Sequence, residues 1–104
     1  MRRWSVIVAP SVWEKITAQV FYIADDSIDN ALAWEARLKD AIFKLGDLPS
    51  FALDEAASER LGYAVHKLVF EGTYLIHYVL DDKAGVVRVI GFRHGARLPT
   101  RGEP

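Results

Sequence analysis

Two runs of sequence decide the fold of this chain: Gly72-Thr-Tyr-Leu-Ile-His-Tyr-Val79 and Val86-Val-Arg-Val-Ile-Gly-Phe-Arg-His-Gly-Ala-Arg97. Both are rich in β-branched and aromatic residues, which favour extended strands. Residues 81–85 lie between them, include a glycine and have the length of a hairpin loop, so the two strands are predicted to pair antiparallel. The second run ends in a polar exit with Arg93, His94 and Arg97, for which the sequence shows no packing role. We therefore look for function at this exit.

Two further strands are predicted upstream. Tyr63–Phe70 precedes a tight turn at Glu71-Gly72, so it should pair with Thr73–Leu80, and the last strand is expected over Val86–Phe92. Trp4–Ala9 is a short apolar run rich in Val, which also predicts a strand. No tight turn connects this first strand to the others, so it can join the sheet only after the intervening segment has folded.

That intervening segment has the apolar spacing of two amphipathic helices. The apolar face of the first comprises Val12, Trp13, Ile16, Val20, Ile23 and Ala24. The apolar face of the second comprises Ala31, Trp34, Leu38, Ala41, Ile42 and Leu45. Ser27 is expected to cap the second helix and Gly46 to end it. The short connection between the helices predicts an antiparallel helical hairpin. Within the next connection, a helical turn is expected over Asp54–Arg60.

The predicted fold class is therefore α+β. We expect an antiparallel helical hairpin packed on a mostly antiparallel four-stranded sheet, with the element order β-α-α-β-β-β. The chain has 104 residues, which is the size of one domain. Residues 1–97 are predicted to form that domain, and residues 98–104 have the composition of a flexible C-terminal tail.

Composition limits the classes of function. The chain has no cysteine, which excludes disulfides, thiolate metal sites and cysteine nucleophiles. It has neither an apolar run long enough to cross a bilayer nor a signal-peptide pattern, so a cytoplasmic protein without membrane contact is expected. Residues 1–59 hold 6 Lys and Arg against 10 Asp and Glu, a net charge of −4, whereas residues 60–104 hold 7 against 4, a net charge of +3. This asymmetry predicts a basic face that meets an acidic or polyanionic partner.

The three histidines do not have the spacing of metal ligands, so neither a metal nor a cofactor is expected. His66 and Lys67 are predicted to face solvent on the open side of the sheet. His77 alternates with Leu75 and Val79, which favours a half-buried packing position over a functional one.

Several short pieces of the chain, in their order and spacing, carry a resemblance to a known family. They are Tyr22-Ile-Ala24, Ala31-Leu-Ala-Trp-Glu-Ala-Arg37, Ala41-Ile-Phe-Lys-Leu45, Leu48-Pro49, Lys67-Leu-Val69, Tyr74-Leu-Ile-His-Tyr78 and Arg93-His-Gly-Ala-Arg97. With these pieces the chain resembles toxins of the RelE/ParE superfamily, from bacterial type II toxin–antitoxin modules. The final His-Gly-Ala-Arg is typical of the ParE-like and plasmid stabilisation branches. The match covers nearly the whole chain.

The resemblance implies one of two activities. RelE-like members are endoribonucleases that cut mRNA in the ribosomal A site, and ParE-like members inhibit DNA gyrase by binding. The RelE pattern has an arginine where this chain has Leu75, an arginine matched by Arg93, and a tyrosine where this chain has Pro99. Arg93, His94 and Lys67 would be the groups of a nuclease, but they do not assemble an acid–base pair. The sequence therefore favours a ParE-like, non-hydrolytic toxin. The alternatives are a ribosome-dependent mRNA endonuclease and a non-toxic, degenerate binding module.

The resemblance also implies a partner. A cognate antitoxin, a small DNA-binding protein with a C-terminal wrapping segment, would neutralise the toxin, and operator DNA would be bound only through that complex. The residues predicted to contact target or antitoxin are Arg93, His94, Arg97, Lys67 and His66. The sequence leaves open which face of the sheet binds, and whether the target is gyrase or the ribosome.

Overall fold

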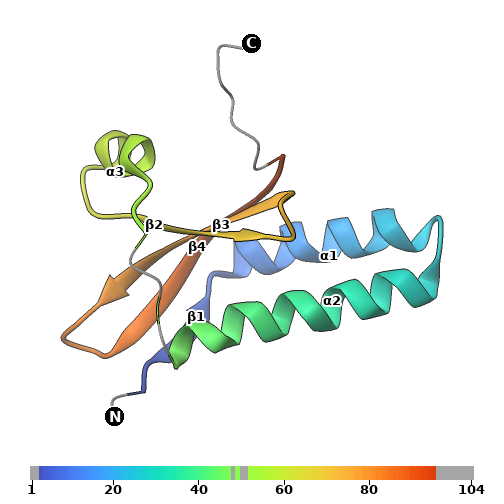
Figure 1. Cartoon of the computed structure of the whole chain (residues 1–104), viewed down its shortest axis with the longest axis horizontal. Coiled ribbons are helices and arrows are strands. Elements are labelled where there is room, and N and C mark those ends of the chain that lie inside the picture. Colours follow the sequence, from blue (N-terminus) through green and yellow to red (C-terminus); the bar gives the residue numbers. More distant parts are fainter. Residues whose placement is uncertain (1–2, 48, 50–51, 96–104) are drawn as a thin grey trace.

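The C-terminal strands form the antiparallel core of a four-stranded sheet (Figure 1). The computed structural model describes residues 3–47, 49 and 52–95. Its elements are β1 (Ser5–Val8), α1 (Pro10–Ala24), α2 (Ile28–Phe43), the short 3-10 helix η1 (Lys44–Gly46), α3 (Glu55–Leu61), β2 (His66–Phe70), β3 (Tyr74–Asp81) and β4 (Val86–His94). The predicted α+β class and element order are confirmed, with α3 in the place of the expected helical turn. The predicted tail, residues 98–104, lies outside the described residues.

The sheet is mixed rather than purely antiparallel. Its order is β1-β4-β3-β2, and β1 pairs parallel to β4 over Ser5–Val8 and Val86–Val89. The other two pairings are antiparallel, as predicted. A parallel neighbour is reached only by a long connection, and here that connection runs through the helices, β2 and β3 before it reaches β4. After the helices the chain therefore enters the sheet at β2, on the edge opposite β1, and β4 later completes the sheet beside β1.

The helical hairpin covers one face of the sheet (Figure 1). Ser27 caps α2 as predicted, because its hydroxyl accepts a hydrogen bond from the Asn30 N–H at 3.1 Å. The core between helices and sheet contains Val12, Ile16, Trp34, Leu38, Ile42, Phe70, Tyr74, Ile76, Tyr78, Val87, Val89 and Phe92. In the described part of the chain, no helix has both the length and the apolar character of a membrane span.

Alternation along β3 separates the two faces of the sheet. Tyr74, Ile76 and Tyr78 belong to the core under the helices, so Leu75 and His77 belong to the opposite, outer face. His66 pairs with Tyr78 and its ring stacks on the tyrosine ring at 5.5 Å, with only 8% of the residue exposed. The expectation that His66 faces solvent on the open side of the sheet was wrong, because the register of β2 turns it toward the core.

Helix α3 lies against the outer face, at one end of the sheet (Figure 1). Asp54 is its N-cap, and Gly62 ends it with a left-handed φ of 84°. The Ser58 hydroxyl donates to the Val65 carbonyl at 3.2 Å and accepts from the Val65 N–H at 2.8 Å. Strand β2 therefore starts at His66, three residues later than predicted. These contacts place α3 as one wall of a hollow over the sheet.

Candidate functional site

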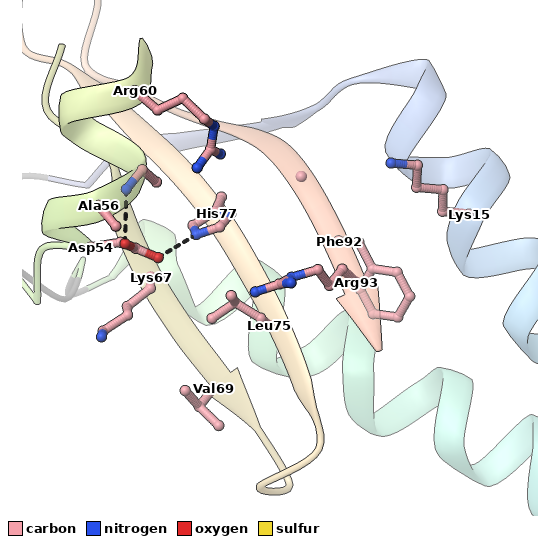
Figure 2. Close-up of a pocket in the computed structure, with 12 residues that line it drawn as sticks. Lys15, Asp54, Ala56, Arg60, Lys67, Val69, Leu75, His77, Phe92 and Arg93 are labelled. Carbon is pink, nitrogen blue, oxygen red and sulfur yellow. Dashed lines mark hydrogen bonds and ion pairs between the residues drawn. The ribbon is translucent and has the colours of Figure 1, made fainter. Parts of the chain in front are cut away.

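The outer face of the sheet and α3 enclose an open cavity of about 720 Å³, here called the groove (Figure 2). Its size is that of a small-ligand site. Helix α3 with its cap contributes Asp54, Ala56, Ala57 and Arg60, and helix α1 contributes Lys15. The sheet contributes Lys67 and Val69 from β2, Leu75 and His77 from β3, and Gly91, Phe92 and Arg93 from β4.

The groove is strongly cationic. Lys15, Arg60, Lys67 and Arg93 come from four different elements, and all four are exposed. Within residues 3–47, 49 and 52–95, none of them lies within ion-pairing distance of a carboxylate. In Figure 2 the guanidinium groups of Arg60 and Arg93 both extend over the sheet toward the cavity. A hollow lined by four basic side chains and one carboxylate, Asp54, has an excess of positive charge and attracts anions.

Asp54 divides its two oxygens between the helix and the sheet. Oδ1 accepts a hydrogen bond from the Ala57 N–H at 3.0 Å, and Oδ2 lies 2.7 Å from His77 Nε2. Both side chains of the Asp54–His77 pair are less than one fifth exposed. Desolvation would raise the pKa of Asp54, but the Ala57 N–H, His77 and Lys67 together outweigh it, and the pKa of the carboxyl lies below its usual range. The pair is therefore built around a carboxylate.

The backbone of β4 leaves room for His77. Gly91 is its cross-strand partner, and a Cβ added at Gly91 would lie 3.4 Å from His77 Cβ and 3.6 Å from Nδ1. A β-bulge follows at His77/Tyr78, next to this pair. Bulges re-aim side chains and are frequent beside functional sites. The imidazole consequently occupies the groove floor with no side chain opposite it.

The groove brings together two of the predicted site residues and separates the others. Arg93 and Lys67 line it. His94 lies on the opposite face of β4, where its ring is 5.0 Å from the ring of Tyr74. His66 also belongs to the core side of the sheet. The expected cluster of Arg93 with His94 thus divides across the sheet, since neighbouring strand residues point to opposite faces. Arg97 lies outside the described residues, as does Pro99.

Sequence reasoning missed His77, Asp54, Arg60 and Lys15. The signal for His77 was present: it alternates with Leu75, which pairs directly with Arg93, so the three share one face. Asp54 gave no such signal, because it meets His77 across 23 residues of sequence. Among the described residues, no group of three or more His, Cys, Asp or Glu side chains is arranged to hold a metal ion.

A comparison with protein-family models found no match to the chain, and a search of curated proteins found none either.

Proposed function

We propose that this chain is the toxin of a bacterial type II toxin–antitoxin module, similar to the RelE/ParE superfamily, and that the groove is the surface that engages its target. The observation that carries the proposal is the convergence of Lys15, Arg60, Lys67 and Arg93 on one open cavity. A helical hairpin on one face of a mixed sheet, with the other face open and cationic, is also consistent with the resemblance in sequence.

We propose DNA gyrase as the target and binding as the mode of action. Leu75, where the RelE pattern has an arginine, lies on the groove floor and is only 5% exposed. An aliphatic side chain at this point has no charge with which to stabilise a reacting phosphate. Such a toxin would act in the cytoplasm and need no cofactor.

The test is a supercoiling assay with purified protein and gyrase. The wild-type chain should inhibit supercoiling at micromolar excess, and Arg93→Ala should weaken inhibition by about tenfold or more, the effect of losing a charged contact at an interface. Arg88→Ala is the matched control, because Arg88 lies on the same strand, pairs with Asp81 at 3.3 Å and does not line the groove. Unchanged supercoiling with wild-type protein would sink the proposal.

A ribosome-dependent mRNA endonuclease is a second candidate, favoured by one observation. The Asp54–His77 pair puts a titratable imidazole in the groove beside Arg93 and Lys67, and the sequence had not indicated such a group. Cleavage would need this group to move a proton and the cations to stabilise charge on phosphorus. Primer extension on translated mRNA after induction should then reveal new codon-dependent 5′ ends. Their absence would remove this candidate.

The proposed antitoxin is a small DNA-binding protein whose acidic C-terminal segment orders on the toxin. The cationic groove supports a partner of this charge. Induction of the chain without antitoxin should arrest growth, and co-expression of the neighbouring gene should restore it. Continued growth on induction alone would instead identify a non-toxic binding module.

A further inference from the structure

The hydrogen bonds of Asp54 fix which nitrogen of His77 carries a proton. The pKa of Asp54 lies below its usual range, so the group is a carboxylate and can only accept hydrogen bonds. Oδ1 already accepts from the Ala57 N–H, and Oδ2 lies 2.7 Å from His77 Nε2. Nε2 must therefore be the donor. In the neutral ring, Nδ1 is then the nitrogen with the free lone pair.

Nδ1 is directed into the groove rather than into the core. It is close to the position a Cβ would take at Gly91, on the outer face of the sheet, and Gly91 leaves that position open. Among the residues that the structure describes, no donor reaches Nδ1. The groove thus contains a hydrogen-bond acceptor that can also take a proton, held in orientation by Asp54.

The surroundings of this acceptor define the ligand that suits it. Arg60, Lys67 and Arg93 line the same cavity and favour phosphate groups. A ligand that satisfies both features carries a hydroxyl next to a phosphodiester. In nucleic acids that arrangement is the 2′-OH of RNA, the group by which proteins distinguish RNA from DNA.

We propose that Nδ1 of His77 accepts a hydrogen bond from the 2′-OH of a single-stranded RNA bound in the groove and then takes the proton of that hydroxyl. Asp54 is the positioning residue, because its bond to Nε2 leaves Nδ1 unprotonated. The proposal rests on the second candidate function, the endonuclease, and assigns its base. As Nδ1 takes the proton, the 2′-oxygen bonds to the adjacent phosphorus and the bond from phosphorus to O5′ breaks. O5′ takes a proton from water, and His77 later returns its proton to solvent. The products are a 2′,3′-cyclic phosphate and a 5′-hydroxyl end.

Three variants of the full chain test this role, each changing Nδ1 in a different way. His77→Gln removes the base. Asp54→Asn keeps a good N-cap, but its amide N–H then faces Nε2, so the ring proton moves to Nδ1. Gly91→Ala adds a methyl group in ordinary contact distance of Nδ1 and partly covers it. Arg88→Gln is the control, because Arg88 does not line the groove. A thermal melt of each variant verifies that it folds.

Two readouts are measured. The first is the ratio of affinities for a fluorescein-labelled single-stranded RNA and a 2′-deoxy strand of the same sequence. The second is the rate of cleavage of mRNA on programmed ribosomes, with detection of cyclic phosphate ends. Wild-type protein should prefer RNA by several-fold, up to about tenfold, the effect of one hydrogen bond. His77→Gln should abolish the preference and slow cleavage by about 10²–10⁴-fold, the usual contribution of a general base.

The other two variants, Asp54→Asn and Gly91→Ala, test whether Asp54 acts by keeping Nδ1 unprotonated and accessible. Asp54→Asn should lose the RNA preference and slow cleavage, and ¹⁵N shifts of the His77 ring should change from the Nε2–H to the Nδ1–H tautomer. Gly91→Ala should slow cleavage less than His77→Gln. If the wild-type protein cleaves mRNA and His77→Gln cleaves at the same rate with the same RNA preference, the endonuclease stands and His77 is not its base. If the wild-type protein neither cleaves mRNA nor prefers RNA, the endonuclease and this role of His77 both fail.

Discussion

Asp54 connects the stability of the fold to the chemistry of the groove. One of its oxygens caps α3 through Ala57, and the other holds His77 on β3. Removing the carboxylate by truncation would therefore disturb both a helix terminus and an imidazole. Substitution by asparagine separates the two roles, because asparagine caps helices about as well as aspartate does. The asparagine variant thus removes the charge of Asp54 while α3, which forms one wall of the groove, keeps its N-cap.

The low pKa of Asp54 predicts a stability change in acid. A carboxyl whose pKa is lower in the folded than in the unfolded state stabilises the fold above its unfolded pKa, and this contribution is lost as pH falls through the folded value. Wild-type protein should therefore lose free energy of unfolding below about pH 4, near the ordinary aspartate pKa. Asp54→Asn should show a shallower loss in urea denaturation curves measured at a series of pH values. If the free energy of unfolding of the two proteins fell in parallel with decreasing pH, the carboxyl of Asp54 would not have a lowered pKa in the folded protein.

At the residue scale, the sequence predicted the cations of the site better than its titratable pair. Arg93 and Lys67 follow strand patterns that can be recognised from alternation and position, and both line the groove. His94 was grouped with Arg93 because the two are adjacent, although adjacency in a strand places side chains on opposite faces. The partner of His77 depends on how the connection before β2 folds back over the sheet, and no local pattern encodes that contact.

At the scale of elements, the groove depends on how α3 is attached. Ser58 Oγ bonds both the N–H and the carbonyl of Val65, and the Asp54 N–H donates to the same carbonyl at 2.9 Å. A single hydroxyl thus satisfies a buried backbone N–H just before β2 begins. The Lys67 N–H donates to the Ala52 carbonyl at 3.0 Å and extends the attachment by one more bond.

Ser58→Ala should destabilise α3 more than is usual for a substitution at a partly exposed residue. The substitution leaves the Val65 N–H buried without its partner, which costs about 1–3 kcal/mol. We expect faster amide hydrogen exchange in residues 55–65 and a lower midpoint in urea. Glu59→Ala is the matched control on the same helix, because Glu59 is exposed and should change the free energy of unfolding by less than about 0.5 kcal/mol. Equal effects of the two substitutions would show that the hydroxyl does not attach the helix.

Gly62 gives a second test of the same helix. Its φ of 84° is left-handed, and an added Cβ would meet no atom within 4 Å, so only backbone strain opposes a side chain there. Gly62→Ala should therefore lower the free energy of unfolding by about 1 kcal/mol, measured by denaturation. Gly62→Asn should recover part of the loss, because asparagine tolerates this conformation better than alanine. If Gly62→Ala left the free energy of unfolding unchanged, a left-handed residue at the end of α3 would be contradicted.

The elements that periodicity specifies were predicted well. The helical spacing, the Ser27 cap and the two C-terminal hairpins all follow from local sequence, and the structure has each of them. The parallel pairing of β1 with β4 could not be predicted from spacing, because it depends on which edge of the later strands β2–β4 lies beside β1. The start of β2 was misplaced because Val65 binds to Ser58 instead of entering the sheet.

At the scale of the whole molecule, the uneven charge of the sequence becomes an uneven surface. Arg60, Lys67 and Arg93 all belong to the basic residues 60–104 and meet in the groove. Lys15 joins them from the acidic part of the chain. The acidic Asp25 and Asp26 lie instead where α1 connects to α2, and in Figure 1 this connection projects away from α3. The fold thus concentrates basic side chains in the groove, which orients a polyanionic partner toward it.

This concentration of basic side chains predicts a salt dependence that identifies the binding face. For a single strand, log K falls with log salt with a slope of about −0.7 for each phosphate neutralised. Binding of the fluorescein-labelled RNA should therefore weaken steeply with salt, and Arg60→Gln and Arg93→Gln should each reduce the slope by about 0.7 if each side chain neutralises one phosphate. Arg88→Gln should leave the slope unchanged, because Arg88 is outside the groove and paired with Asp81. If Arg88→Gln flattened the salt dependence and the two groove variants did not, RNA would bind to another face, and the groove would not be the RNA-binding site of this molecule.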